Sequence, residues 1–458
     1  MKNNGKLVTF CAVFLSAALF LGGCAGIAPS GNTEKDLKED TPREDSSREK
    51  VKLVICTPPL LYGKLGGENA ESSAYTDFLE YAAEKFAAQY SEAEVEYVIQ
   101  GFDYVDEDKV IKDSLGTADA PDVLFEGFFN MGSYIHTGYM VPLDDIIGEE
   151  IRADISDRIW SEGMYQGKTY MFPFYHLPNT LAYNAEMFRE AGLDEYISES
   201  GTITSWSIEE WELILDTLAE ELPSTEYPMM MYAKNNQGDT HIMVLLRAFG
   251  CPFFTDDGSF CVNTPEGIEA LGWIQNGVQR GWFPPASENL QLMDLMELFR
   301  NSQLAICVMN PSNQVFFDQR GLDVRQVNFP SVNGTGISTT FVSGFGIFDN
   351  GDEEKIKAAK AFVKFVCNDM ELQQACLPNI PVRTSLQEVY KDRILMNDAY
   401  AANESTLVNF TNNLPNWTGV RAVFYPRIQD LLLGEKTPEE VAADIDEVCN
   451  AAVKETVN

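Results

Sequence analysis

The chain alternates between short runs of β-favouring residues and longer segments with apolar residues on one helical face. Three short runs rich in branched and aromatic residues predict strands at Val51–Cys56, Val95–Gln100 and Asp122–Phe125. Between the first two, residues 75–90 place these side chains on one face of a helix: Phe78, Leu79, Ala82, Phe86 and Tyr90. Strand, helix and strand in this order predict a parallel sheet covered by helices.

Capping sequences mark the starts of three later helices. Ser207 with Glu210 forms a capping box, Thr264 precedes a proline at the first helical position, and Thr437-Pro438 does the same before Glu440. The predicted inward residues are Trp211, Ile214, Leu215 and Leu218; Ile268, Leu271, Ile274 and Val278; and Val441, Ile445 and Val448. Further strands are predicted at Met229–Tyr232, Leu304–Met309, Gln326–Phe329 and Phe341–Phe348, with a hairpin turn at 255–259.

The N-terminal segment has the features of an export signal. Lys2 and Lys6 precede an apolar run that is too short to span a bilayer, and Leu21-Gly22-Gly23-Cys24 follows it. These four residues resemble the bacterial lipobox, which implies a signal peptide over residues 1–23 and a lipid on Cys24 that anchors the protein to the outer face of the cell membrane. An ordinary secreted protein is the alternative. Residues 24–50 carry alternating charges and predict a disordered tether.

Composition narrows the class of partner. The 458 residues predict two or three domains. A formal net charge of −37 argues against nucleic acid or an anionic membrane surface as the partner, because both repel such a chain. The 45% of hydrophobic residues predicts a folded body with an acidic surface rather than a disordered polyanion.

Histidines and cysteines do not indicate a metal centre. A three-histidine site would need all of His136, His176 and His241, so no metal and no cofactor are expected. Seven cysteines remain beyond Cys24, an odd number, so at least one thiol is free. Cys56 and Cys307 lie in apolar runs and are expected in the core, while two local pairings stay open: Cys251–Cys261 and Cys367–Cys376.

Several catalytic patterns fail on inspection. The loop Gly163–Thr169 has the wrong glycine spacing for a phosphate-binding loop and no helix after it, and Ser343-Gly344 lacks the preceding glycine of a nucleophile elbow. The acid-rich segment Asp103–Asp113 lacks the glycine of a calcium loop and is expected to be a solvated helix start. A glycosidase carboxylate pair stays open, since no spacing singles one out.

One ordered set of motifs covers residues 51–455. The most informative are Gly167-Lys168-Thr169-Tyr170 with Pro173, Tyr183-Asn184, Phe188 with Gly192-Leu193, and Ser205-Trp206 before a capped helix. Before them come Ala120-Pro121-Asp122 and Gly138–Asp144, and after them Phe299–Ile306 and Gly434–Glu440. In this order they resemble the extracellular solute-binding proteins of sugar ABC importers, although Ser302 or Asn301 stands where the family usually has glycine.

The resemblance implies an α/β, periplasmic-binding-protein-like fold (class II) with two doubly wound lobes joined by a hinge at a ligand cleft. Residues 51–175 with 345–378 would form lobe 1, and 179–341 with 384–458 would form lobe 2. The crossovers are expected at Tyr175–Pro178, Val342–Gly344 and Pro378–Arg383. The protein would be a monomer and would catalyse no reaction.

The resemblance also places the expected ligand site on loops and crossovers. Sugars rest their C–H faces on aromatic rings and bond their hydroxyls to planar polar groups. The residues expected to bind the ligand are Glu126, Phe129, Asn130, Tyr175, His176, Asn310, Ser312, Ser343, Gly344, Trp417 and Arg421. Asn310 and Ser312 stand where relatives often have an aromatic residue.

The expected function is capture of a mono- or oligosaccharide and delivery to an ABC permease in the membrane. Three alternatives stay open: a sensor that reports to a membrane kinase, a binder of a non-sugar solute, and a glycan-degrading surface enzyme. An anionic solute would use Arg383 and Arg421.

Overall fold

The computed structural model describes residues 49–58, 61–62, 73–102, 107–117, 119–234, 239–318, 320–377, 379–408, 411 and 413–455. The predicted signal peptide and Cys24 lie outside these residues, as does nearly all of the predicted tether. Lys50, the last residue of that tether, belongs to the first strand instead. Its Nζ lies 3.0 Å from Glu96 and 3.3 Å from Glu94 on the neighbouring strand.

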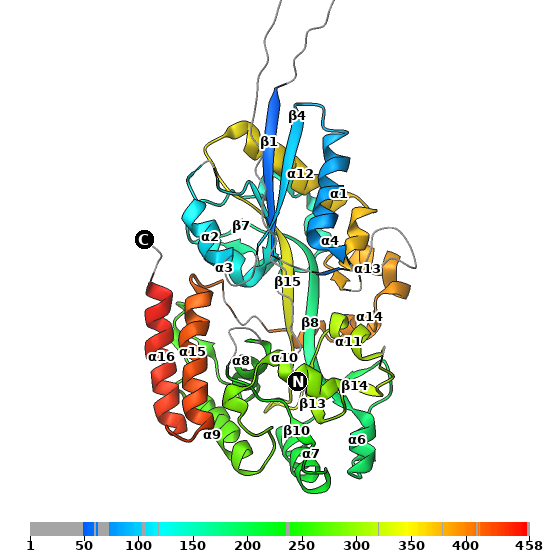
Figure 1. Ribbon diagram of the computed structural model, residues 1–458, viewed down its shortest axis with the longest axis vertical. Coiled ribbons are helices and arrows are strands. Elements are labelled where there is room, and N and C mark those ends of the chain that lie inside the picture. Colours follow the sequence, from blue (N-terminus) through cyan, green and yellow to red (C-terminus); the bar gives the residue numbers. More distant parts are fainter. Residues whose placement is uncertain are drawn as a thin grey trace, which may run out of the picture. The chain divides into compact units, whose positions relative to one another are not determined.

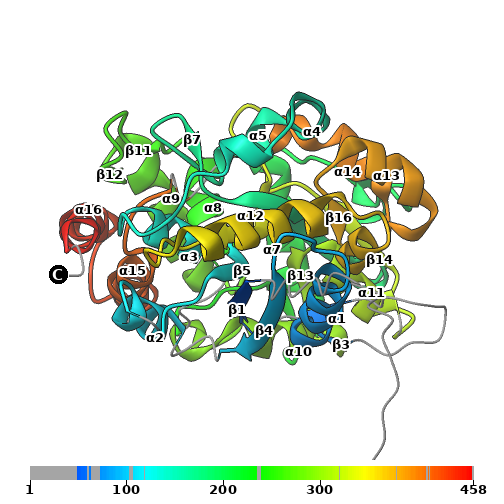
Figure 2. The ribbon, with the colours of Figure 1, turned by 90° about the horizontal axis from the view of Figure 1, so that it is seen from above.

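The first lobe is built on the predicted parallel strands. β1 (Lys50–Thr57) pairs in parallel with β4 (Glu94–Gly101) and with β5 (Val123–Gly127), and α1 (Tyr75–Ala87) connects the first two. The strand-helix-strand prediction is therefore confirmed. α12 (Glu353–Asn368) lies beside the same strands (Figure 2). It packs on α1, where the rings of Phe86 and Phe362 are 5.5 Å apart.

The second lobe has a shorter parallel pair, β10 (Tyr227–Met229) and β13 (Leu304–Met309). β10 ends where the strand predicted at Met229–Tyr232 was expected to begin, because only residues 227–229 lie in register with β13. β14 (Val324–Val327) adds a strand, and these helices surround the pair: α7 (Ile208–Glu221), α8 (Asp239–Ala248), α9 (Pro265–Gln279) and α10 (Leu292–Arg300).

Two long strands join the lobes. β8 (Phe172–Asn184) pairs with β15 (Thr339–Ile347) on the side of the first lobe and with β13 and β14 on the side of the second (Figure 1). The hydrogen-bonded path runs β10-β13-β8-β15-β5-β1-β4. β16 (Ile380–Pro381) pairs with β8 at Tyr175 and His176, where β15 also pairs, so the segments predicted to cross lie side by side. Pro378 lies outside the described residues.

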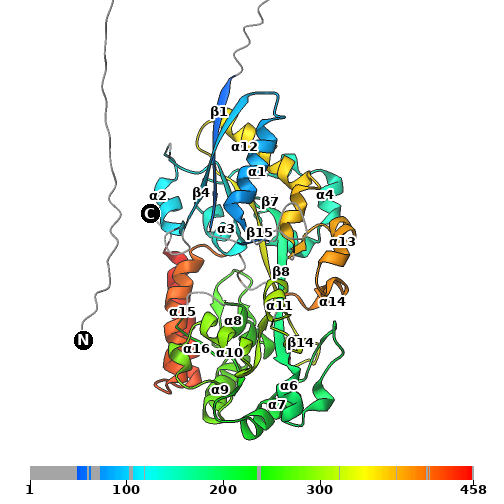
Figure 3. The same ribbon diagram turned by 45° about the vertical axis from the view of Figure 1, so that its right-hand side comes forward.

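Four C-terminal helices lie to either side of these strands (Figures 1 and 3). α13 (Thr384–Tyr390) and α14 (Asn397–Ala402) lie on one side. α15 (Trp417–Leu432) and α16 (Pro438–Lys454) lie on the other, where they pack on each other and on α9.

The sequence signals located the helix starts closely. The capping boxes of α7 and α16 are both formed, and Thr264 caps α9 through the backbone N–H of Gly267. Val278 was expected to face inward, but it is 41% exposed. The buried face of α9 instead follows Trp273 and Gly277, whose missing side chain makes room for Trp282 and Phe283.

The remaining elements are β2 (Leu61–Tyr62), β3 (Ser73–Ala74), α2 (Glu107–Ser114), α3 (Phe128–Ile135), α4 (Glu149–Asp154), α5 (Asp157–Ser161), β6 (Met164–Tyr165), β7 (Lys168–Thr169), α6 (Ala185–Glu190), β9 (Ile203–Thr204), β11 (Phe253–Phe254), β12 (Phe260–Cys261) and α11 (Pro311–Asp318). β11 and β12 form the predicted hairpin. The rejected phosphate loop is a hairpin of β6 and β7, with Gly167 in its turn.

The described residues contain neither a disulfide bond nor a helix that could span a membrane. In the described part of the chain all seven cysteines are free, so neither local disulfide forms. Cys56 and Cys307 are buried in the core as predicted. Within the same ranges no helix has both the length and the apolar composition to cross a bilayer.

Candidate ligand-binding site

The crossing strands divide the lobe junction into two faces. Leu177 of β8 lies opposite Phe341 of β15, and His176 lies opposite Val342. Neighbouring side chains of a strand point to opposite faces, so Leu177 and Phe341 share one face and His176 and Val342 the other. The His176 ring agrees with this arrangement, because its Nδ1 lies 3.0 Å from Oγ1 of Thr340, two residues before Val342.

Residues from both lobes meet on the Phe341 face. Phe129 of α3 stacks near Trp417 of α15, with ring centroids 6.4 Å apart and planes 21° from parallel. The Phe341 ring is 5.1 Å from that of Phe129, and the Arg421 guanidinium lies 4.6 Å from the centre of the Phe129 ring. We call these four residues the aromatic junction. It combines flat apolar faces with a planar cation, which are the groups that recognise sugars or other ring-shaped polar solutes.

A glycine makes this packing possible. A Cβ atom on Gly127, which precedes α3, would lie 2.3 Å from Cζ of Phe341. Any other residue at this position would displace the Phe341 ring, because such a contact is far below the van der Waals distance. Gly127 therefore lets the end of β5 and the start of α3 approach the crossing strands.

Two carboxyl groups are buried beneath the junction. Glu107, the first residue of α2, is fully buried, and Glu126, at the end of β5, is 4% exposed. The sequence predicted a solvated helix start over Asp103–Asp113, and this is wrong for Glu107. Residues 103–106 of that segment lie outside the described chain. The helix turns its first side chain inward, toward the carboxyl group of Glu126, and neither carboxylate oxygen of Glu107 has a hydrogen-bond partner among the described residues.

Burial affects the protonation of both carboxyl groups. Burial raises the pKa of Glu107 and that of Glu126, because it removes water from the charged form. The nearby carboxylates of Glu126 and Asp108 raise the pKa of Glu107 further, while the positive charge of Arg421 lowers the pKa of Glu126. At neutral pH the two carboxyl groups therefore hold at least one proton between them.

The other predicted site residues differ in their surroundings. Asn130 is half-buried in α3. Asn310 follows β13 and its Nδ2 lies 3.4 Å from Oδ1 of Asn179 on β8. Ser312 lies in α11, but its side chain is outside the described part of the structure. Trp417 is fully buried in the junction.

Three of the predicted site residues have structural roles in this conformation. Tyr175 is buried, with its ring 6.1 Å from Phe125 in the core of the first lobe. Ser343 is fully buried beside a break in the register of β15 and β8. Gly344 adjoins that break, and a Cβ on it would lie 2.3 Å from the carbonyl oxygen of Phe172. Its role is to let the two strands approach closely.

His176 is separated from the aromatic junction. It is buried on the opposite face of β8, and burial lowers its pKa to about 4, so its ring is neutral. Tyr175 and His176 were predicted to line one site. That prediction fails because neighbouring residues of a strand point to opposite faces.

Sequence reasoning missed Phe341 and Glu107. Phe341 was assigned only to a strand, and its position opposite Leu177 depends on a register that no single sequence reveals. Glu107 was grouped with exposed acids. A usable signal was its distance of four residues from Ile111, which places both on one buried face of α2.

The described residues bear on two other kinds of ligand, a metal ion and an anionic solute. Within the described ranges no three histidine, cysteine, aspartate or glutamate side chains gather closely enough to hold an ion. Arg383, considered for an anionic solute, lies with its Nε 2.8 Å from Asp154 in an ion pair that is mostly shielded from water. The positive charge of Arg383 is therefore already paired with the carboxylate of Asp154.

The fold and the junction define a two-lobed α/β binding protein. Residues 69–370 match the family of bacterial extracellular solute-binding proteins, and the chain belongs to this family. A binding protein of Brucella abortus (strain 2308) is 21% identical over 334 residues, which are 70% of this chain and 77% of that protein. The family consists of solute-binding proteins rather than enzymes, so the expectation of no catalytic activity is confirmed.

Solved structures show the same fold at low identity. The sugar-binding protein MalE of Xanthomonas citri has a TM-score of 0.70 at 15% identity, covering 88% of this chain and 97% of its own. An ABC substrate-binding protein of Listeria monocytogenes in complex with cycloalternan has a TM-score of 0.68 at 17% identity, covering 88% and 98%. The cyclic α-maltosyl-1,6-maltose binding protein of Arthrobacter globiformis has 0.69 at 18%, covering 88% and 99%. The predicted fold class is confirmed.

Proposed function

We propose that this solute-binding protein captures a saccharide between its two lobes and delivers it to an ABC permease. The aromatic junction is the observation that supports this function best. Phe129 comes from the first lobe and Trp417 from the second, and their rings stack on each other, so a ring-shaped guest that takes a place between them as the lobes part would contact both lobes at once. Contacts to both lobes favour the closed arrangement over an open one.

The chemistry of the junction suits a neutral polyhydroxylated guest. The two aromatic rings offer flat faces for C–H groups, and Arg421 and Asn130 supply hydrogen-bond donors for hydroxyls. Glu126 adds a carboxyl group whose pKa is raised by burial, and its protonated form donates as well as accepts hydrogen bonds. Structural neighbours in complex with cycloalternan and maltotetraose support the choice of an α-linked oligosaccharide.

Delivery to a permease rests on the family and on the N-terminal motif. We propose that Cys24 is lipidated after removal of residues 1–23, that residues 24–50 tether the binding body, and that the body is a monomer. The lobes would comprise residues 51–175 with 345–378 and residues 179–341 with 384–458. A tethered body reaches a permease in the same membrane without leaving the cell surface.

Binding and compaction test this function together. The protein would be titrated with maltotetraose and with cycloalternan by calorimetry, and its radius of gyration measured by small-angle scattering with and without each sugar. We expect a saturable binding isotherm and a smaller radius with the sugar that binds. No binding by either sugar would contradict the proposed ligand class, and hydrolysis of either sugar would contradict a binding role.

The sensor alternative has no specific support in the structure. The identity of the membrane partner distinguishes transport from sensing. The tagged protein would be purified from detergent-solubilised membranes of its native cells after crosslinking. We expect ABC permease subunits in the crosslinked product. A membrane kinase in their place would assign the protein to sensing instead of transport.

A further inference from the structure

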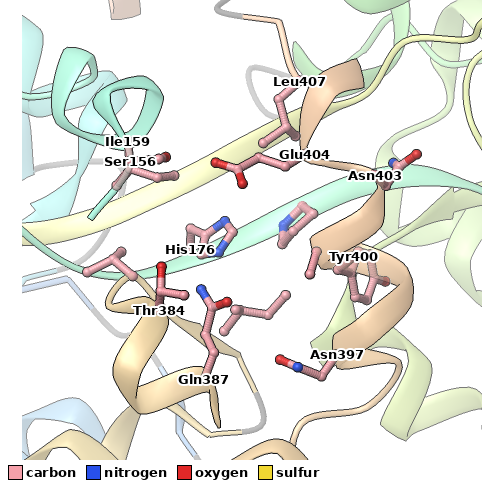
Figure 4. Close-up of a pocket in the computed structure, with 14 residues that line it drawn as sticks. Ser156, Ile159, His176, Thr384, Gln387, Asn397, Tyr400, Asn403, Glu404 and Leu407 are labelled. Atoms are coloured by element: carbon pink, nitrogen blue, oxygen red, sulfur yellow. The ribbon is translucent and has the colours of Figure 1, made fainter. Parts of the chain in front are cut away.

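A hollow lies on the His176 face of the crossing strands (Figure 4). It has a volume of about 120 Å³, which is several times the roughly 10–15 Å³ needed to hold one water molecule. We call it the hinge-side pocket. It is lined by Ser156, Ile159, His176, Pro178, Ile380, Val382, Thr384, Gln387, Asn397, Tyr400, Ala401, Asn403, Glu404 and Leu407.

The pocket is separate from the aromatic junction. His176 and Pro178 reach it from alternate positions of β8, whereas Leu177, between them, faces the junction. None of the four residues of the junction lines the pocket. A solute in the hinge-side pocket therefore does not touch the side chains that define the aromatic junction.

Two polar atoms at the pocket lack partners. Ser156 is the N-cap residue of α5, but its hydroxyl makes no capping bond. Its Oγ and the Oδ1 of Asn397 are both buried and reach no hydrogen-bond partner among the described residues. Buried polar atoms without partners cost free energy, so a guest with hydroxyl groups at these two points would stabilise the pocket.

The lining favours an uncharged guest. His176, whose ring is neutral, lies with Thr384 and Gln387 on one side, and Glu404 is exposed at the rim. A buried charge without a partner is strongly disfavoured, and no cationic side chain lines the pocket to pair with an anion. Apolar side chains cover the rest of the wall and suit C–H groups: Ile159, Ile380, Val382 and Leu407.

The pocket also lies between parts fixed to different lobes. Although α13 falls within the range proposed for the second lobe, it is held to α4 of the first lobe, where Asp154 accepts from the backbone N–H of Ser385 at 2.8 Å and pairs with Arg383. α14 is held to β14 of the second lobe, because the Tyr400 hydroxyl donates to Oε1 of Gln326 at 3.0 Å. The walls of the pocket are thus positioned by both lobes.

We propose that the hinge-side pocket is a second binding site, distinct from the aromatic junction, for a small uncharged polyol of the size of erythritol. The polyol hydroxyls would bond the free Oγ of Ser156 and the free Oδ1 of Asn397, and its carbons would rest on the apolar wall. The site stands whether or not the junction binds saccharides.

Erythritol itself is the probe. Saturation-transfer difference NMR would be recorded on the full chain and on Ala401→Leu, which fills the pocket from an exposed helical position. Ala402→Leu is the matched control, because Ala402 is the next residue of α14, is also exposed, and does not line the pocket. Thermal melting of all three proteins would show that each is folded.

We expect saturation transfer to erythritol from the unchanged protein and from Ala402→Leu, and its loss in Ala401→Leu. Asn397→Ala should weaken binding about three- to tenfold, the effect of losing one neutral hydrogen bond. No transfer from the unchanged protein would overturn the proposal. Transfer that persists in Ala401→Leu would also overturn it, because erythritol would then be binding elsewhere, for example at the junction. Titration with maltotetraose reads the junction independently.

Discussion

The guanidinium of Arg421 lies 4.6 Å from the centre of the Phe129 ring, although the two residues belong to different lobes. Arg421 is on α15, which packs on α9 of the second lobe, and Phe129 is on α3 beside β5 of the first. This cation–π contact is direct evidence that the two lobes meet at the aromatic junction. It also brings a positive charge near the buried carboxyl of Glu126.

Arg421→Ala should weaken binding of the saccharide. The change removes a hydrogen-bond donor to the guest that contributes about 1 kcal/mol or more, so the dissociation constant of maltotetraose should rise about fivefold or more. Isothermal titration calorimetry measures the change. Thr418→Ala, an exposed position on the same helix, should leave the dissociation constant unchanged. An equal loss in both variants would point to damage to α15 rather than to the junction.

Glu107→Gln should stabilise the protein at neutral and alkaline pH. The raised pKa means that the folded state keeps a proton on Glu107 after the unfolded chain has released it, so folding stability falls as pH rises above the usual glutamate pKa. Glutamine cannot ionise and avoids this loss. Since one pKa unit corresponds to about 1.4 kcal/mol, we expect a gain of at least about 2 kcal/mol at pH 8 and little gain at pH 4.5.

Urea unfolding at the two pH values measures the effect of Glu107→Gln. The control is Glu84→Gln, on the exposed face of α1. Its stability should follow that of the unchanged protein at both pH values. If Glu107→Gln were less stable than the unchanged protein at pH 8, the raised pKa of Glu107 would be wrong.

His176 should lower stability in acid. Its pKa of about 4 in the folded protein lies below the usual value near 6.5, so between these pH values the unfolded chain binds a proton that the folded chain refuses. Stability should therefore fall as pH drops from 6.5 to 4, with a contribution of about 3 kcal/mol from this residue. His176→Asn should flatten that decline in unfolding experiments, whereas the partly exposed His136→Asn should not.

Gly344→Ala should destabilise the crossing strands. Its Cβ would lie 2.3 Å from the carbonyl oxygen of Phe172, and a backbone atom cannot move aside cheaply. We expect a loss of about 1–3 kcal/mol in urea unfolding. Gly148→Ala is the control, since that glycine has negative φ and nothing within 4 Å of the added atom. Equal stability of Gly344→Ala and the unchanged protein would show that β8 and β15 have room to separate.

Local chemistry made much of the fold predictable. Ser207 and Thr437 begin helices where the capping boxes placed them, and the strand at Leu304–Met309 has the predicted bounds. Such signals depend on residues within a few positions of each other. The same locality explains the error at Val278, because helical spacing alone does not show which face Trp273 and Gly277 bury.

The site was less accessible to sequence reasoning. The contact between Phe129 and Trp417 agrees with the expectation that both lie at the lobe junction, but their part in ligand binding stays a prediction. Glu107 and Phe341 join them only through the tertiary arrangement of α2 and β15. The position of His176 on the opposite face depends on strand alternation at the crossing, which residue types alone do not encode.

The continuity of β8 limits the motions by which a bound ligand could be released. The strand has 13 residues, about 43 Å of extended chain, and it is hydrogen-bonded to β15 in one lobe and to β13 in the other. Pulling the lobes straight apart would break this ladder, whereas bending and twisting of the ribbon leave most of it intact. We therefore expect the lobes to separate by bending and twisting about this ribbon, and we expect its torsional stiffness to limit how far they open.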